Sequence, residues 1–169
     1  MSRVLADSGL KPDTLTLEIT ETALMRDTDA TALRLAALKE LGVRIAIDDF
    51  GTGYSSMAHL QQFPVDALKI DRSFITQMTH NREGETILRT LVQLGKALSI
   101  ETLAEGIEQA RELLLLQGES CDSGQGFLFA RPLDAADTAT FLANWTASRA
   151  EPQETPAVTA TFDLPPALL

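Results

Sequence analysis

Four short segments of the sequence share one pattern, in which β-favouring apolar residues alternate with polar ones and a carboxylate or a lysine stands near the end. The four segments are residues 15–20, 43–48, 68–71 and 99–105, and residues 126–130 form a fifth candidate. Because successive side chains of a strand point to opposite faces, this alternation predicts strands with one apolar and one polar face.

The stretches between these segments have helical spacing. Their apolar stripes are Ala32, Leu35, Leu38 and Leu41 within residues 28–41, and Ile87, Leu91, Leu94 and Leu98 within residues 83–98. Helices are also predicted over residues 107–117 and 134–147, with Gly42 ending the first helix and Asp134 capping the last. Repeated strands and helices predict an α/β fold with a parallel sheet, helices outside and polar residues inside. An antiparallel sheet with one wet face explains the alternation as well.

Carboxylates stand near the ends of three predicted strands, at Glu18, Asp48, Asp49 and Glu105. In a parallel sheet these ends meet at one edge, which is where a β/α barrel keeps its chemistry. Carboxylates in close proximity repel unless they are protonated or neutralised, and an all-oxygen set favours Mg²⁺ or Mn²⁺. His59 and His80 offer no zinc-like spacing, so we interpret them as surface or packing residues.

Two neighbouring features have competing interpretations. The Asp48–Asp49 pair suits the bridging of two metal ions in phosphodiester chemistry, and residues 49–56 form a glycine-containing loop after a strand; a turn capped by aspartates is the alternative. Lys69 lies between apolar residues of a strand, which favours an inward position with Asp71 as its partner. A lysine at an exposed sheet edge is the alternative.

Composition narrows the classes of partner and compartment. A formal net charge of -10 opposes binding to nucleic acid polymers, so a phosphate ligand would need bound cations. The single cysteine, Cys121, is interpreted as a small buried residue that fits a reducing compartment. The amino terminus has no apolar run of signal-peptide length, and Leu113–Leu116 is too short to span a bilayer, so we predict a soluble, cytoplasmic chain. The proline-rich residues 150–169 are predicted to form a flexible tail.

Five strings resemble, in order and spacing, successive motifs of EAL domains, the bacterial cyclic di-GMP phosphodiesterases. They are Leu17–Glu21, Ile47–Gly53, Leu68–Phe74, Ala104–Glu108 and Gln125–Phe129. The resemblance implies a TIM-type β/α barrel whose two Mg²⁺ or Mn²⁺ ions activate water to hydrolyse cyclic di-GMP to linear pGpG. A non-catalytic cyclic di-GMP receptor or protein-interaction module is the alternative. The tripeptide Asp49-Phe50-Gly51 also occurs in protein kinases, but the chain lacks the glycine-rich loop and the His-Arg-Asp loop that a kinase needs, so we reject that interpretation.

The resemblance also implies a role for each matched site residue. Glu18, Asp48 and Asp49 would bind the metal ions. Glu105 would hold a metal ion or the attacking water, Lys69 would orient or activate that water, and Gln125 would contact the second metal site or its water. Glu21 would pin the loop after Asp49, and Asp71 would be a substrate-side or supporting acid.

The sequence departs from the family pattern in two respects. It contains no Glu-Ala-Leu tripeptide, and the family's asparagine ligand before the Glu18 motif is also absent. We therefore expect residues 1–149 to be a truncated EAL domain with roughly the last five strands of the barrel, inactive by itself. Open edges of the barrel predict completion or covering by homo-oligomerisation. Sensory or GGDEF domains are expected elsewhere in the parent protein, which could be membrane-tethered.

Overall fold

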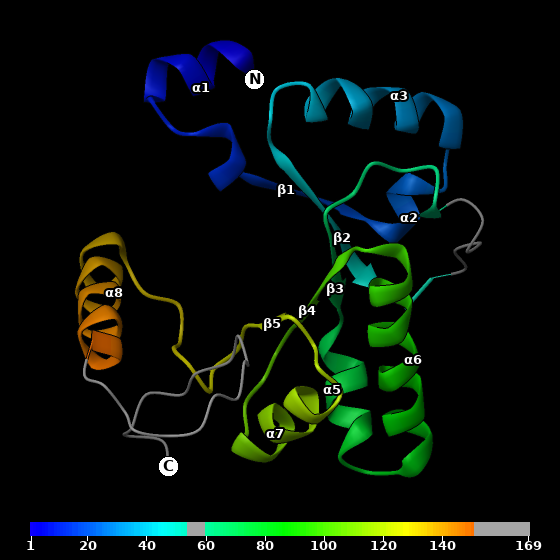
Figure 1. Ribbon diagram of the computed structural model, residues 1–169, viewed down its shortest axis with the longest axis vertical. Helices are drawn as coiled ribbons and strands as arrows, with labels where there is room; N and C mark the ends of the chain where they lie inside the picture. Colours follow the sequence, from blue (N-terminus) through cyan, green and yellow to red (C-terminus); the bar gives the residue numbers. More distant parts are fainter. Residues whose placement is uncertain (54–59, 151–169) are drawn as a thin grey trace.

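The computed structural model describes residues 1–53 and 60–150, and its centre is a sheet with the strand order β1-β2-β3-β4-β5 (Figure 1). The strands are β1 (Thr16–Thr20), β2 (Arg44–Phe50), β3 (Ala67–Ile70), β4 (Glu101–Ala104) and β5 (Ser123–Gly124). All four neighbouring pairs in this sheet are parallel. The predicted parallel α/β fold is therefore confirmed, and the antiparallel alternative is wrong.

Described helices lie between β1 and β2, between β3 and β4, and between β4 and β5, as parallel pairing requires. Helix α1 (Ser2–Ser8) and the 3₁₀ turn η1 (Pro12–Thr14) precede β1; the other helices are α2 (Glu21–Leu24), α3 (Thr28–Lys39), α5 (Arg72–Met78), α6 (Arg82–Leu98), α7 (Ala110–Gly118) and α8 (Ala135–Ala150). Asp134 caps α8 as predicted, because its carboxylate accepts the Asp137 N–H at 2.9 Å. Gly42, with φ of 84°, follows the end of α3 by three residues.

The two faces of the sheet have different chemistry. Ile45, Ile47, Leu68 and Ile70 point to the face that the helices cover, and each is at most 1% exposed. They join two apolar clusters, one extending to Leu35 of α3 and the other to Leu88 of α6. Arg44, Asp48, Lys69 and Glu101 occupy the alternate positions of the strands, on the opposite face. The predicted division into an apolar outer face and a polar inner face is confirmed.

The predicted apolar stripe of α6 is displaced by about one residue from the row that is fully buried. Ile87 is 41% exposed, and Leu91, Leu94 and Leu98 are only partly buried. The buried row is Gly84, Leu88, Val92 and Gly95. A Cβ added to Gly95 would lie 2.4 Å from Thr102 Cγ2 of β4, and one added to Gly84 would meet the backbone of Gln77. These glycines bring α6 into close contact with its neighbours, which a search for large apolar residues overlooks.

The prediction of a strand over residues 126–130 is wrong. Strand β5 lies earlier, at Ser123–Gly124, and residues 127–129 form a turn in which Phe129 N–H donates to Gly126 O at 3.1 Å. Leu128 N–H donates to Ile107 O at 2.9 Å, so residues 127–129 contact the loop after β4 as a turn and not as an extended strand. Helices α2 and α5 were not predicted, although each begins at the residue directly after a predicted strand, at Glu21 and at Arg72.

Some predictions fall outside the part of the chain that the structure describes. These concern His59, residues 54–56 of the glycine-containing loop, and the tail over residues 150–169 apart from Ala150, which ends α8. Among the described helices, none combines the length and the apolar character that crossing a bilayer requires.

Candidate active site

Lys69 of β3 is the centre of the polar inner face. Its Nζ lies 2.7 Å from Glu18 Oε2, 2.8 Å from Asp48 Oδ1 and 2.9 Å from Glu105 Oε1. These carboxylates come from β1, from β2 and from the residue after β4. Side chains of four different elements thus meet at the carboxyl end of the sheet, as predicted, and the exposed-edge interpretation of Lys69 is wrong because the residue is 6% exposed.

Burial and hydrogen bonding act in opposite directions on the Lys69 ammonium. Burial disfavours the charged form and by itself would lower the pKa, but the close contacts with the carboxylates of Asp48, Glu18 and Glu105 outweigh it and raise the pKa above its usual value. Lys69 is therefore a permanent cation at neutral pH. It offsets part of the mutual repulsion of the surrounding acids.

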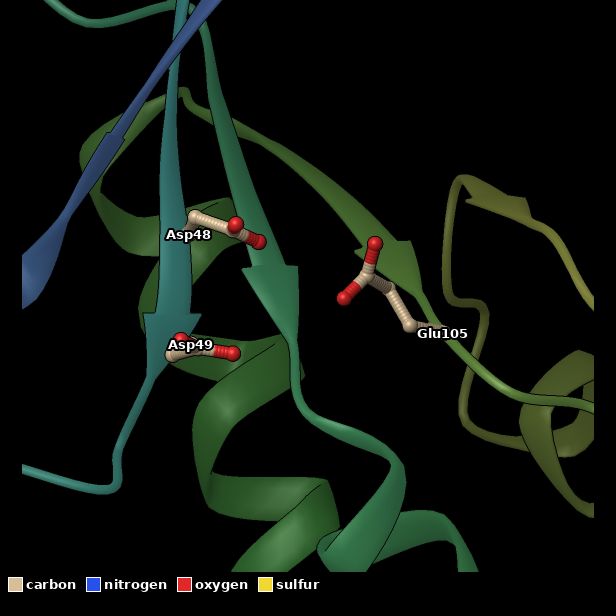
Figure 2. Close-up of side chains that lie close together, drawn as sticks. All are labelled: Asp48, Asp49 and Glu105. Carbon is tan, nitrogen blue, oxygen red and sulfur yellow. The ribbon is translucent and has the colours of Figure 1, made fainter.

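Asp48 and Asp49 both reach this site although they are adjacent in β2. Adjacent residues of a regular strand point to opposite faces. Here the register between β2 and β3 shifts between Ile47 and Phe50, and Asp49 has a positive φ of 53°. Figure 2 shows both carboxylates directed toward Glu105, and the three side chains offer oxygens that lie within 4.8 Å of one another.

The group formed by Asp48, Asp49 and Glu105 has the properties of a divalent-cation site. All of its donors are carboxylate oxygens, which suit Mg²⁺, Mn²⁺ or Ca²⁺. Asp48 Oδ1 is buried and, among the described residues, has no hydrogen bond of good geometry despite the nearby Lys69 ammonium. With Glu18 included, four carboxylates face one ammonium, so negative charge remains to be neutralised. The residues present therefore fit a bound cation.

Gln125 and Glu105 form the other side of the site. Gln125 Nε2 donates to Glu105 Oε1 at 2.8 Å, and the backbone N–H of Gln125 donates to Ala104 O at 2.9 Å. Lys69 contacts the same oxygen of Glu105. Both contacts end on Oε1, so neither of them uses Oε2.

Glu21 and Asp71 lie at the edge of the site. The buried Glu21 carboxylate accepts the N–H groups of Gly51 and Gly53 at 2.8 and 3.3 Å, so it contacts the loop after Asp49. Asp71 caps α5 by accepting the Ser73 N–H at 3.0 Å, and hydrogen bonds from Ser73 lower its pKa below the usual value. The ion pairs of Lys69 are with Glu18, Asp48 and Glu105, and the predicted pairing with Asp71 is not among them.

Sequence reasoning missed a cavity of about 450 Å³ beside Glu105 and Gln125. Its lining includes Arg72, Glu108, Phe127 and Arg131. Arg131 stacks on Phe127, with its guanidinium carbon 4.8 Å from the ring centre. Arg72 lies in the same motif as Lys69, and Glu108 lies in the same motif as Glu105. Their place in these motifs was the sequence feature that could have indicated that they lie near the site.

Fold and site together define a class: a parallel α/β domain with an acidic centre that could hold a metal ion, at the carboxyl ends of its strands. The sequence comparison is more specific, because the model of the EAL domain family matches residues 1–132. The chain belongs to the EAL domain family, whose members adopt a TIM-barrel fold.

Named relatives agree with this assignment. The chain is 44% identical over 138 residues to the cyclic di-GMP phosphodiesterase NbdA of Pseudomonas aeruginosa, covering 82% of this chain and 18% of NbdA. It resembles the structure "PaMucR Phosphodiesterase, c-di-GMP complex" with a TM-score of 0.78 and 42% identity, covering 80% of this chain and 55% of that one. It also resembles a manganese/cy-diGMP complex of Klebsiella pneumoniae BlrP1, with a TM-score of 0.72 and 35% identity. That match covers 78% of this chain and 33% of the BlrP1 chain. The chain thus spans less than a fifth of NbdA and little more than half of the PaMucR structure.

Proposed function

We propose that this chain contributes the acidic half of a cyclic di-GMP phosphodiesterase site, which hydrolyses the cyclic dinucleotide to linear pGpG. One observation carries the proposal: Glu18, Asp48 and Glu105 converge on Lys69 from separate strands, within 2.7–2.9 Å. The names of NbdA and of the PaMucR complex support cyclic di-GMP as the substrate. In the reaction, a water oxygen forms a bond to one phosphorus and the bond from that phosphorus to a ribose oxygen breaks.

Each side chain has a proposed task. Asp48, Asp49 and Glu105 would hold Mg²⁺ or Mn²⁺, with Glu18 completing the metal-binding set. The bound cation supplies Lewis-acid stabilisation of the phosphoryl oxygens and makes water more acidic. Lys69, whose ammonium forms ion pairs with three carboxylates, would keep them in place and orient the attacking water. Gln125 would hold Glu105 through Oε1, leaving Oε2 to contact a cation or accept the water's proton.

The two remaining residues have supporting tasks. Glu21, through its bonds to Gly51 and Gly53, would pin the loop that follows Asp49. Asp71 would support the site from the start of α5. Residues 1–149 would form a truncated EAL domain and residues 150–169 a flexible tail. The cytoplasmic location, homo-oligomerisation through the sheet edges and GGDEF or sensory domains in the parent protein are further proposals from the sequence.

Turnover by the purified 169-residue chain tests the proposal. Cyclic di-GMP is incubated with Mn²⁺ or Mg²⁺, and pGpG is separated by chromatography. Because the sequence lacks the Glu-Ala-Leu motif, we expect slow turnover or none from the chain by itself. We expect turnover when the chain is joined to the amino-terminal part of a relative's EAL domain, and its loss in Glu105→Gln of the same chimera.

A receptor without catalysis is the second candidate, favoured by the missing Glu-Ala-Leu motif. Calorimetry with cyclic di-GMP separates the two. Binding without pGpG formation, in both the chain and the chimera, would support the receptor. An inactive chimera that also fails to bind the dinucleotide would contradict both functions, and rapid turnover by the chain alone would refute the expected inactivity.

A further inference from the structure

Arg72 lies directly against the backbone that follows Glu105. It is the first residue of α5, three positions after Lys69. A Cβ built on Gly106 would be 2.5 Å from Arg72 Cγ, 2.7 Å from its Cβ and 2.8 Å from its Cδ. Gly106 also has a φ of 72°, a backbone conformation that favours glycine. The aliphatic part of Arg72 therefore occupies the space that a side chain at position 106 would need.

The next residue of this loop is also close-packed. Ile107 is fully buried, and its N–H donates to Gln125 O at 3.1 Å. A Cβ on Gly126 would lie 2.1 Å from Ile107 O. The turn after Glu105 thus contacts both Arg72 and the Gln125–Gly126 segment. Gln125 is the residue that binds the Glu105 carboxylate.

The guanidinium of Arg72 makes a second contact, 2.9 Å from Glu108 Oε1. The two side chains are 57% and 37% exposed. Ion pairs this exposed typically contribute about 0–1 kcal/mol, because water screens them. The packing of the aliphatic part of Arg72 on Gly106 therefore restrains the loop after Glu105 more strongly than the ion pair does. The ion pair with Glu108 orients the guanidinium.

We propose that Arg72 is a positioning residue for Glu105, acting through the contact of its aliphatic part with Gly106. The inference rests on the proposed function in one respect, that Glu105 serves as a ligand or proton acceptor. Arg72 also lines the cavity that adjoins Glu105 and Gln125, so direct contact with a phosphate is the rival role for its charge. The two roles separate because positioning needs the aliphatic part and phosphate binding needs the guanidinium.

A spectroscopic test uses the hydrogen bond between Gln125 Nε2 and Glu105 Oε1. The side-chain amide signals of Gln125 are recorded in the ¹⁵N-labelled full chain without metal and assigned by their absence in Gln125→Met. We expect Arg72→Ala to move these signals toward those of a solvent-exposed glutamine. Arg72→Met, which keeps the aliphatic part, should leave them in place. Arg89→Ala is the matched control, since it removes another exposed, ion-paired arginine, whose partners Glu85 and Glu119 are not among the site residues.

Either of two results would overturn the proposal. Unchanged Gln125 signals in a folded Arg72→Ala variant would mean that Glu105 does not depend on Arg72. Equal displacement in Arg72→Ala and Arg72→Met would assign the effect to the charge. Thermal melting of each variant verifies that it is folded.

Titration with Mn²⁺ alone adds a second readout. Loss of residues that orient metal ligands commonly lowers metal affinity by roughly tenfold or more. We expect that loss for Arg72→Ala, and an affinity close to wild type for Arg72→Met; the reverse order would contradict the positioning role. If the wild-type chain binds no Mn²⁺, the proposed metal site of this chain fails, while the Gln125 signals still decide the role of Arg72.

Discussion

At the scale of single residues, Asp49 is held in a backbone conformation that costs stability. A non-glycine residue at positive φ, here 53°, loses roughly 1–2 kcal/mol relative to an ordinary conformation, although Asp and Asn tolerate it better than other residues do. The carboxylate also lies beside those of Asp48 and Glu105. Both costs are explained if this position serves cation binding.

Asp49→Asn should therefore stabilise the metal-free protein while removing its cation affinity. Asparagine keeps the left-handed backbone and removes one of the repelling charges, so we expect the free energy of unfolding to rise by about 1 kcal/mol. Urea denaturation in EDTA measures the change, and Mn²⁺ titration measures the affinity. Asp29→Asn is the control: it removes an exposed charge from the first turn of α3, where a carboxylate favours the helix, so it should not raise the free energy of unfolding and should leave the Mn²⁺ affinity unchanged. A less stable Asp49→Asn protein would contradict this account.

The residue-scale predictions succeeded where the type of residue decides its place. A lysine between apolar strand residues had to find carboxylates, and Lys69 does. Which carboxylates it finds depends on the register of β1, β2 and β4, and alternation alone cannot give that register. For the same reason Asp71 was assigned to Lys69 although it caps α5. The shift in register that brings Asp49 beside Asp48 also has no local signature beyond the acidic pair itself.

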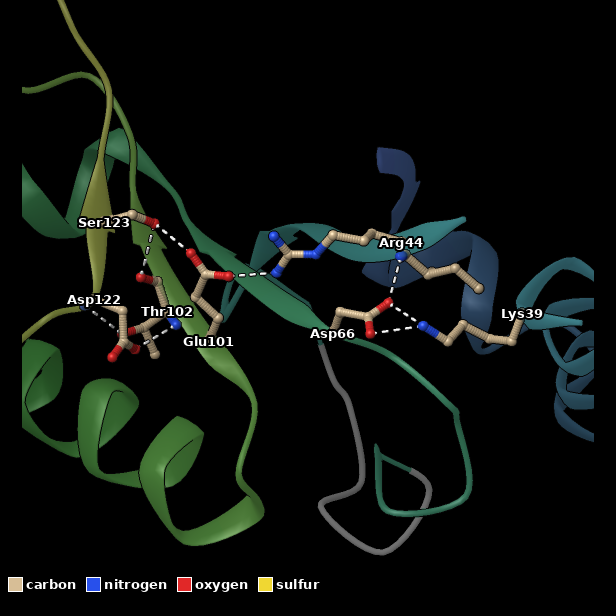
Figure 3. Close-up of polar contacts among 8 residues, drawn as sticks. Lys39, Arg44, Asp66, Glu101, Thr102, Asp122 and Ser123 are labelled. Carbon is tan, nitrogen blue, oxygen red and sulfur yellow. Dashed lines mark hydrogen bonds and ion pairs between the residues drawn. The ribbon is translucent and has the colours of Figure 1, made fainter. Parts of the chain in front are cut away.

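At the scale of secondary-structure elements, two aspartates link neighbouring strands in the same way at the amino end of the sheet (Figure 3). Asp66, just before β3, accepts the Ile45 N–H of β2 at 2.7 Å and pairs with Lys39. Asp122, just before β5, accepts the Thr102 N–H of β4 at 2.8 Å and the Thr102 hydroxyl at the same distance. Between them, Glu101 bonds to Arg44 and Ser123. This end of the sheet is therefore crosslinked by side chains.

Asp122→Ala should destabilise the fold markedly. Thr102 is fully buried, so the change leaves its N–H and hydroxyl without this acceptor, at a cost of about 1–3 kcal/mol. Asp122→Asn keeps an acceptor oxygen and should cost less. Urea denaturation gives both values, with Glu40→Ala at the exposed end of α3 as the control. Equal stability of Asp122→Ala and wild type would show that the bond is dispensable.

The stability contributed by the Arg89–Glu119 ion pair, which connects α6 to the end of α7, should depend on pH. Hydrogen bonds from Arg89 to both Glu119 oxygens, at 2.9 and 3.0 Å, lower the pKa of Glu119 below its usual value. A lowered folded-state pKa contributes stability above the unfolded-state pKa of about 4.3, and this contribution is lost as the pH falls through the folded-state value. Glu119→Gln should therefore destabilise the protein at pH 7, and the difference from wild type should shrink in acid. Urea denaturation across the pH series measures it; a difference that grows in acid would refute this contribution of the ion pair.

At the scale of the whole molecule, the apolar clusters lie on the helix-covered side of the sheet, and Cys121 belongs to the cluster beneath α6 and α7. Burial raises the pKa of its thiol, although a hydrogen bond from the thiol to Thr102 O opposes the rise. A thiol that is 4% exposed and protonated should react with iodoacetamide only when the fold opens.

We therefore expect native Cys121 to be alkylated slowly, at a rate that rises with urea in parallel with global unfolding. Intact mass measures the labelling, and the protein in concentrated urea supplies the fast reference. Fast labelling in native buffer would show that this part of the core opens independently of the remaining fold.

The alternation of apolar and polar residues predicted the two faces of the sheet correctly. The close contacts at Gly84 and Gly95 depend on how α6 crosses its neighbours, so they could not be deduced from the spacing of residues.

The ammonium among the acids has a consequence for how the protein is made. Because Lys69 supplies a positive charge among the carboxylates, the strands of a newly synthesised chain can assemble before any metal ion binds. Purification in a chelator should consequently yield folded protein that is ready to be loaded afterwards, with assembly and loading as separate events in time.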